Sequence, residues 1–138
     1  WSVDTSGNVW WSDGLFKLYR MKRKTEVSEW QEEFKKKVYP EDWVEFEARI
    51  SVLMQGLESL DLKARVFIDH KYQWVHFLGE PVFKDSAFKG IIGTTQNVDK
   101  QEKALRSVQA QNRFIERYFD SEKHRELLEG LKKLSNDD

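Results

Sequence analysis

The middle of the chain alternates between apolar and polar positions with a period of two residues. From Leu60 to Ile68 every second residue is apolar, and the residues between them are Asp61, Lys63, Arg65 and Phe67. This period is typical of a strand with one buried face. Residues 73–83 and 88–98 continue with β-branched and aromatic residues, and polar turns at 69–71 and 84–86 separate the segments. We therefore expect three antiparallel strands, whose apolar face helices must cover.

The N-terminal part of the chain predicts a further hairpin and three helices. Residues 1–4 and 9–11 flank a Thr-Ser-Gly-Asn turn, and Ser12 or Asp13 can cap a short helix up to residue 19. Ser28 and Gln31 have the spacing of a capping box, which predicts that the next helix begins at Ser28. Pro40 suits the first position of a third helix, whose apolar face is formed by Trp43, Phe46, Ile50, Leu53 and Leu57.

The last 39 positions have a helical pattern, beginning with a second capping box formed by Asp99 and Glu102. The first apolar set alternates steps of three and four residues, which is the spacing of a two-helix seam: Leu105, Val108, Asn112, Ile115 and Phe119. Asp120 and Ser121 predict a break or a new cap, and the polar residues 135–138 predict a frayed end. The seam predicts a homodimer whose register Asn112 would fix.

Composition narrows the class of protein. A chain of 138 residues is long enough for one core, and 23 basic against 24 acidic residues give no bulk attraction to nucleic acid or to acidic membranes. The absence of Cys excludes disulfides and thiolate chemistry and fits a reducing compartment, so we expect a cytoplasmic location. No apolar run approaches the roughly 20 residues of a membrane span. Because the chain starts at Trp1, we expect a segment of a longer protein, without membrane contact of its own.

Three sequence patterns resemble those of PAS domains from bacterial sensory proteins. Ala64-Arg65-Val66, followed by Asp69 and Tyr72-Gln73-Trp74-Val75, is similar to one motif of that family. The segment GTTQNVD at 93–99 is similar to the motif that closes the family's last strand, and VYPED at 38–42 to the motif before its long helix. The three motifs come in the family's order and spacing over roughly residues 1 to 103.

The resemblance implies an α+β fold: a five-stranded antiparallel sheet in the order 2-1-5-4-3, with helices on one face and a C-terminal signalling helix. Residues 1–99 would form the PAS domain and residues 100–138 a helical, coiled-coil-like linker. It also implies a cavity between sheet and helices for a small ligand. Periodicity places seven residues around this cavity, each of which also fits a packed core: Trp10, Phe46, Ile50, Leu53, Val66, Trp74 and Ile92. No charged residue is clearly aimed inward, so we expect an apolar ligand or none.

The junction of the last strand and the C-terminal helix is the predicted signal relay. In the family an Asp stands at position 97 and a Thr at position 99, where this chain has Asn97 and Asp99. Asn97 keeps a hydrogen-bond acceptor without the charge, and Asp99 can cap the helix. The resemblance implies that movement of the sheet reaches an output domain of the same polypeptide, a histidine kinase or a diguanylate cyclase. The alternative is a ligand-free PAS module for dimerisation and interaction.

Candidate catalytic and metal chemistry is sparse. We find no phosphate-binding loop and no Ser-His-Asp pattern, so we expect no enzymatic activity and no metal site, and the sequence identifies no cofactor. His70 is expected in an exposed turn, His76 as a hydrogen-bonded structural residue and His124 on an exposed helix face. The flavin photochemistry of light-sensing relatives needs a Cys that this chain lacks.

Two basic clusters, at 20–24 and 35–37, leave a weaker third hypothesis of nucleic-acid binding. Solvated basic groups in a loop and at a helix end explain them as well, and we expect no nucleic-acid partner. Val66 and Phe67 put apolar groups on both faces of their strand. A second protomer or the helix after Asp99 would cover the outer face.

Overall fold

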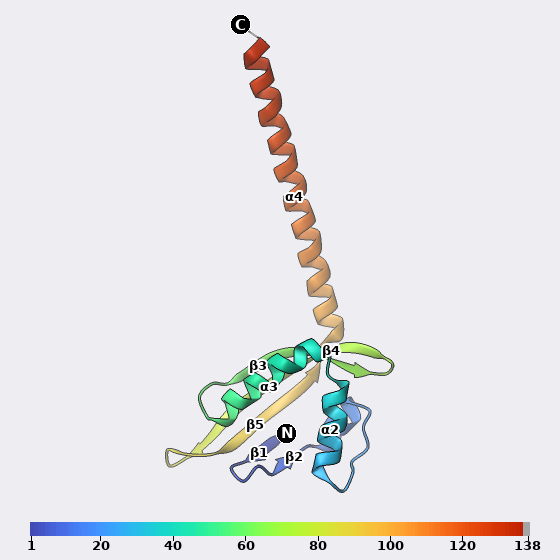
Figure 1. Ribbon diagram of the computed structural model, residues 1–138, viewed down its shortest axis with the longest axis vertical. Helices are drawn as coiled ribbons and strands as arrows, with labels where there is room; N and C mark the ends of the chain where they lie inside the picture. The colour runs from blue at the N-terminus through green and yellow to red at the C-terminus, as the bar shows by residue number, and fades with distance from the viewer. Residues whose placement is uncertain (137–138) are drawn as a thin grey trace. The chain divides into compact units, whose positions relative to one another are not determined.

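The computed structural model describes residues 1–136, so the outer half of the predicted frayed end, residues 137–138, lies outside the described residues. The chain divides into two compact units, the first from Trp1 to Asp99 and the second beginning at Lys100. The first unit holds a five-stranded antiparallel sheet in the order β2-β1-β5-β4-β3 (Figure 1). This order confirms the one that the sequence motifs implied.

The strands are β1 (Ser2–Asp4), β2 (Val9–Trp10), β3 (Leu60–Ile68), β4 (Lys71–Lys84) and β5 (Ala87–Asn97). Their predicted boundaries hold to within about two residues. The β3–β4 turn consists of Asp69 and His70, both with positive φ (50° and 63°), a conformation in which Gly is the least strained residue. Strand β4 contains a register shift between Val82 and Phe83, just after Pro81.

Three helices cover one face of the sheet: α1 (Asp13–Leu18), α2 (Val27–Lys37) and α3 (Pro40–Met54). Figure 1 shows α3 lying across the sheet. The even positions of β3 and the odd positions of β4 face these helices, and Ala64, Val66 and Val75 are completely buried there. Burial of this apolar surface is the main contribution that the sequence pattern makes to stability.

The start of α2 differs from the expectation. The helix begins at Val27 with Glu26 as its N-cap, so Ser28 lies inside the first turn and the predicted capping box is wrong. The burial of Trp30 and Phe34 fixes the helix against the core, and this packing outweighs the preference of a Ser for the cap. The start of α4 also differs from the expectation, because Asp99 is the first residue of the helix and its Oδ1 accepts the N–H of Trp74.

The start of α3 is pinned to the edge strand β3 by a pair of charged residues. Asp42 accepts hydrogen bonds from the Arg65 backbone N–H (2.8 Å), Nε (2.9 Å) and a guanidinium NH₂ group (2.9 Å). The guanidinium also stacks on Tyr39, 3.8 Å from the ring centroid, and the Tyr39 N–H donates to the Arg65 carbonyl oxygen (2.9 Å). These bonds join residues from two of the three sequence patterns, and they cover polar groups at the open edge of β3.

Helix α4 spans Asp99–Asn136 and has 38 residues, and from Lys100 on it forms the second unit. The helix continues through Asp120 and Ser121, so the predicted break is wrong; the Glu, Lys and Arg residues that follow are good helix formers. All five seam residues are exposed on α4. Among the described residues, no helix combines the length and the apolar character needed to cross a membrane.

Candidate ligand cavity and signal-relay network

A cavity of about 420 Å³ lies between the inner face of the sheet and the helices of the first unit. This volume is within the range of small-molecule sites. Aliphatic side chains contribute part of its wall: Val3, Val9, Leu15, Ile50 and Ile91. Aromatic side chains contribute most of the rest: Trp1, Trp11, Tyr19, Phe34, Trp43, Phe46 and Phe77.

A pair of glycines makes room for one wall of the cavity. Gly79 and Gly93 face each other across β4 and β5, and the ring of Trp1 lies over both. A Cβ at Gly93 would come within 2.1 Å of Trp1 Cζ2, and a Cβ at Gly79 within 2.8 Å of Trp1 Cη2. The absence of a side chain at Gly79 and Gly93 therefore lets the Trp1 indole ring pack directly on the sheet.

The aromatic rings at the floor of the cavity form one packed cluster. The Trp11 ring centroid lies 5.4 Å from that of Tyr19 and 5.4 Å from that of Phe34, and the Phe46 and Phe77 centroids are 5.0 Å apart. These separations are in the favourable range for tilted and edge-to-face pairs. The cluster gives the cavity stiff, flat walls.

Three polar groups lie in this apolar wall. Burial raises the pKa of Tyr19, and its contact with the Thr95 side chain lowers that pKa by less. The two hydroxyls are close enough for this interaction, but Thr95 Oγ1 makes no hydrogen bond of ordinary length and angle among the described residues. Trp1 Nε1 is in the same state. A buried donor without a partner costs about 1–3 kcal/mol, which marks both groups as exceptional.

The buried phenol of Tyr19 should make the protein sensitive to alkali. Its pKa is raised on folding, so the folded protein keeps a proton that the unfolded chain loses near pH 10. Stability is therefore intact below pH 10 and should fall by about 1.4 kcal/mol per pH unit above it. Urea unfolding between pH 9 and 11 would measure this slope. In Tyr19→Phe the slope should become shallower by about that amount, and an equal slope in both proteins would contradict the prediction.

The charged residues of the cavity lie at its mouth, between α2 and α3. Gln31, Glu32, Lys35 and Glu47 line this part and are exposed to solvent. Lys35 Nζ lies 5.5 Å from the ring centroid of Trp43, in the range of a cation–π contact. The charged side chains of the lining are thus at the mouth and not in the interior, in line with the lack of inward-facing charges in the sequence.

The seven residues placed around the cavity from periodicity have three different positions. Phe46 and Ile50 line it, whereas Leu53 and Val66 are completely buried in the core beside it. The other three are on the outer face of the sheet, so their placement was wrong: Trp10, Trp74 and Ile92. In each strand the alternation was assigned to the wrong face. Trp11 lines the cavity instead of the adjacent Trp10, and Ile91 lines it instead of the adjacent Ile92. In β4, Phe77 lines it, three residues after Trp74.

The cavity residues that escaped the sequence reasoning include Trp1, Trp11, Tyr19 and Thr95. The signal that could have found Trp1 is the pair of glycines at Gly79 and Gly93, which only the strand register brings together. Thr95 carries no such signal, because a Thr in a strand is ordinary.

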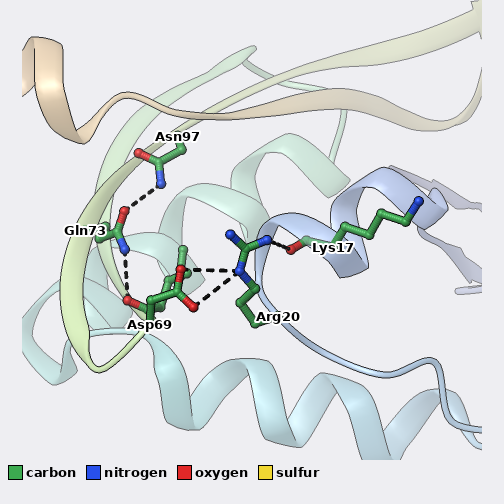
Figure 2. A network of polar contacts seen from close by, with 6 residues as sticks. Lys17, Arg20, Asp69, Gln73 and Asn97 are labelled. Carbon is green, nitrogen blue, oxygen red and sulfur yellow. Dashed lines mark hydrogen bonds and ion pairs between the residues drawn. The ribbon is translucent and has the colours of Figure 1, made fainter.

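Polar contacts of Arg20 link the end of α1 to the β3–β4 turn (Figure 2). Arg20, the residue after Tyr19, donates from its side chain to the Lys17 carbonyl oxygen (3.0 Å) and to both carboxylate oxygens of Asp69 (3.3 Å each). Both side chains of the ion pair are more than half exposed, so it contributes little to stability. It does hold the strained turn at Asp69 against the end of α1.

Two amide side chains continue this network to the start of α4 (Figure 2). Gln73 Nε2 donates to the Ile68 carbonyl oxygen (2.9 Å), and Asn97 Nδ2 donates to Gln73 Oε1 (2.9 Å). Asn97 Oδ1 accepts the N–H of Asp99 (3.0 Å), the first residue of α4. Asn97 therefore covers an open N–H of the helix, and its bond to a neutral amide replaces the ion pair for which the family's Asp would be suited.

Asp99 closes the network. Its Oδ1 accepts the backbone N–H of Trp74 (3.0 Å), and Val98 N–H donates to the Trp74 carbonyl oxygen (2.9 Å). The predicted relay residues Asn97 and Asp99 thus link β4 and β5 to the first turn of α4.

The histidines take no part in the cavity. His76 is on the outer face, where its Nε2 lies 2.6 Å from Asp61 Oδ1, and His70 is in the exposed turn. His124 lies on an exposed part of α4. Over residues 1–136, the structure contains no cluster of three or more acidic or His side chains that could hold a metal ion.

The architecture defines a PAS-like fold, as the sequence motifs implied, and comparisons with solved structures agree. The chain is similar to a sensory box histidine kinase/response regulator from Burkholderia thailandensis E264 (13% identity, TM-score 0.50) over 59% of this chain and 63% of that one. It is also similar to a domain of a putative light and redox sensing histidine kinase from Haloarcula marismortui (19% identity, TM-score 0.50) over 70% of this chain and 84% of that one. The chain thus spans less than two thirds of the first protein. No family model and no curated protein matches the sequence.

Proposed function

We propose that this chain is a non-catalytic sensory module of a larger signalling protein, such as a histidine kinase or a diguanylate cyclase. A small molecule binds in the aromatic cavity, and the polar network passes its effect to α4. The observation that carries the proposal is the arrangement of contacts between the two parts. Tyr19 lines the cavity and the adjacent Arg20 pairs with Asp69; from the carbonyl oxygen of the neighbouring Ile68, hydrogen bonds run through Gln73 and Asn97 to Asp99. The solved structures with this fold come from proteins named as sensors, which supports the same function.

Asn97 is the residue on which the relay depends. In Asn97→Leu, Asp99 N–H and Gln73 Oε1 lose their partner, so the first turn of α4 should open more often. We expect amide exchange at residues 99–103 to become about tenfold faster, which hydrogen–deuterium exchange mass spectrometry would measure. Gln96→Leu is the matched control, since Gln96 is on the outer face of the same strand. Equal exchange at these residues in all three proteins would rule out the relay as drawn.

We propose that the module works as a homodimer joined along α4. The apolar seam residues are exposed on α4, with Leu105 at 47%, Val108 at 52%, Ile115 at 49% and Phe119 at 60%. A helix with such a stripe is marginal alone and is stabilised by pairing with a second helix. In a parallel pair Asn112 would meet its own copy and fix the register.

Replacing Asn112 tests the seam. Asn112→Leu should tighten self-association while allowing higher oligomers or shifted registers, because a buried Asn limits both. Sedimentation equilibrium would measure the association constant, which we expect to rise about tenfold. Ser107→Leu, outside the seam, should leave the constant unchanged. If both variants associate as the wild type does, the seam residues are not the dimer interface.

The other two hypotheses have less support. A ligand-free interaction module would also dimerise through α4, but it does not account for the cavity of about 420 Å³. Nucleic-acid binding would need free basic groups, yet Arg20 pairs with Asp69, Arg23 with Asp13 (2.8 Å) and Lys24 with Glu33 (3.5 Å). We also propose that the module acts on the cytoplasmic side, in keeping with its lack of Cys.

A further inference from the structure

The shape and chemistry of the cavity wall restrict the kind of molecule that fits it. Aromatic rings line the cavity from several directions, and the pairs among them lie 4.9 to 6.3 Å apart between ring centroids, tilted or edge-to-face except for the stacked pair of Trp43 and Phe46. A planar ring system makes the largest contact with such surfaces, whereas a branched or globular molecule would separate them. The volume of about 420 Å³ suits a compact molecule of one or two rings.

The distribution of charge excludes an ionised group in the interior. The charged side chains of the lining are Glu32, Lys35 and Glu47, and all three are exposed at the mouth. A carboxylate or ammonium group deep in the cavity would lose its hydration and find no opposite charge, which is costly. The part of the ligand that enters must therefore be neutral.

The two buried groups without partners define the polar end of the ligand. Trp1 Nε1 and Thr95 Oγ1 belong to side chains that line the cavity, and neither has a hydrogen-bond partner among the described residues. An indole N–H can only donate, and a hydroxyl can donate as well. A hydrogen-bond acceptor on the ligand would satisfy one or both once a side-chain movement brings these buried atoms to the cavity surface.

We infer that the cavity binds a neutral, planar aromatic molecule that carries a hydrogen-bond acceptor, such as a ring nitrogen or a carbonyl oxygen, directed at Trp1 Nε1 and Thr95 Oγ1. This inference rests on the proposed sensory function, because it names the ligand class of the same cavity. The aromatic wall supplies affinity by apolar contact, and the two donors supply selectivity for the acceptor.

Two bicyclic probes of the same shape test the inference. Quinoline carries one acceptor nitrogen and naphthalene carries none, and 2-naphthoate adds a negative charge. The dissociation constants of all three would be measured by ligand-observed NMR on the whole chain, in the wild type, Trp1→Phe and Thr95→Val. Thr94→Val is the control, because Thr94 is on the outer face of the same strand.

We expect quinoline to bind about tenfold more weakly to Trp1→Phe, to Thr95→Val or to both, while the affinity for naphthalene changes less than twofold. This double comparison cancels the difference in hydrophobicity between the probes. We expect Thr94→Val to behave as the wild type and 2-naphthoate to bind at least tenfold more weakly than naphthalene. Unfolding of the free variants would show that they are folded. Loss of the unpaired hydroxyl in Thr95→Val should not destabilise the protein, whereas Trp1→Phe also removes ring atoms that pack on Gly79 and Gly93.

Two results would overturn the inference in different ways. If quinoline and naphthalene bind and both variants change them equally, the donors select nothing, and the ligand class is wrong while a sensory cavity remains possible. If no neutral probe binds the wild type at millimolar concentration, the cavity is not a small-molecule site. The ligand class and the proposed sensory function would then fail together.

Discussion

Leu53→Ala should destabilise the domain by about 2–5 kcal/mol, the largest effect that we expect from a single truncation. The Leu53 side chain is completely buried, and it packs against β4, where a Cβ at Gly79 would come within 2.8 Å of Leu53 Cδ2. Its removal leaves a void between α3 and the sheet that rigid neighbours cannot close. Urea unfolding followed by tryptophan fluorescence would give the free energy of unfolding.

Leu57→Ala is the matched control for this truncation. It removes the same atoms from the residue that follows the turn after α3, where Leu57 is 69% exposed. We expect a change of less than about 0.5 kcal/mol. Equal effects of the two substitutions would mean that α3 does not pack on the sheet as described.

Asp42→Ala should have the second largest effect, about 2–3 kcal/mol. The substitution removes three hydrogen bonds to Arg65, two of them from its charged group, and leaves a half-buried guanidinium and a strand N–H without this acceptor. The Asp42 and Arg65 side chains are 18% and 32% exposed, so solvent replaces the lost bonds only in part. The midpoint of urea unfolding would measure the loss.

A second Asp–Arg pair in the chain provides the control for Asp42→Ala. Asp13 and Arg23 lie 2.8 Å apart, but their side chains are 86% and 48% exposed. Asp13→Ala should change the free energy of unfolding by about 0.5 kcal/mol or less, because exposed ion pairs contribute little. If the two substitutions have equal effects, the contact between α3 and β3 is not the anchor that the geometry indicates.

The fold was largely predictable from the sequence, and the reason lies in particular residues. The alternation from Leu60 to Ile68 gave the strand and its buried face because the helix layer covers one side only. The motifs at Asp42 and Arg65 implied a specific topology, which the hydrogen bonds between these residues now explain. The start of α2 and the continuity of α4 were missed, since packing decides helix ends as much as local preference does.

The cavity was less predictable because it depends on contacts between distant strands. Trp10 and Trp11, or Ile91 and Ile92, are adjacent residues of similar character, and only the strand register decides which one faces inward. The seat of the Trp1 ring arises where Gly79 and Gly93 become neighbours, although they are far apart in the sequence. The positions of Asn97 and Asp99 were easier to predict, because both residues are at the strand–helix junction itself.

The measurement that tests the central claim most directly is native mass spectrometry of the protein after incubation with the small-molecule fraction of a cell extract. Denatured protein and two variants would be run beside it. Val9→Phe fills the cavity, whereas Val44→Phe adds the same group at a position that is 72% exposed.

The account predicts a bound mass that is present in the wild type and in Val44→Phe, absent from Val9→Phe and lost on denaturation. A native protein without added mass, or a bound mass that Val9→Phe retains, would contradict the claim that this cavity is a ligand-binding site.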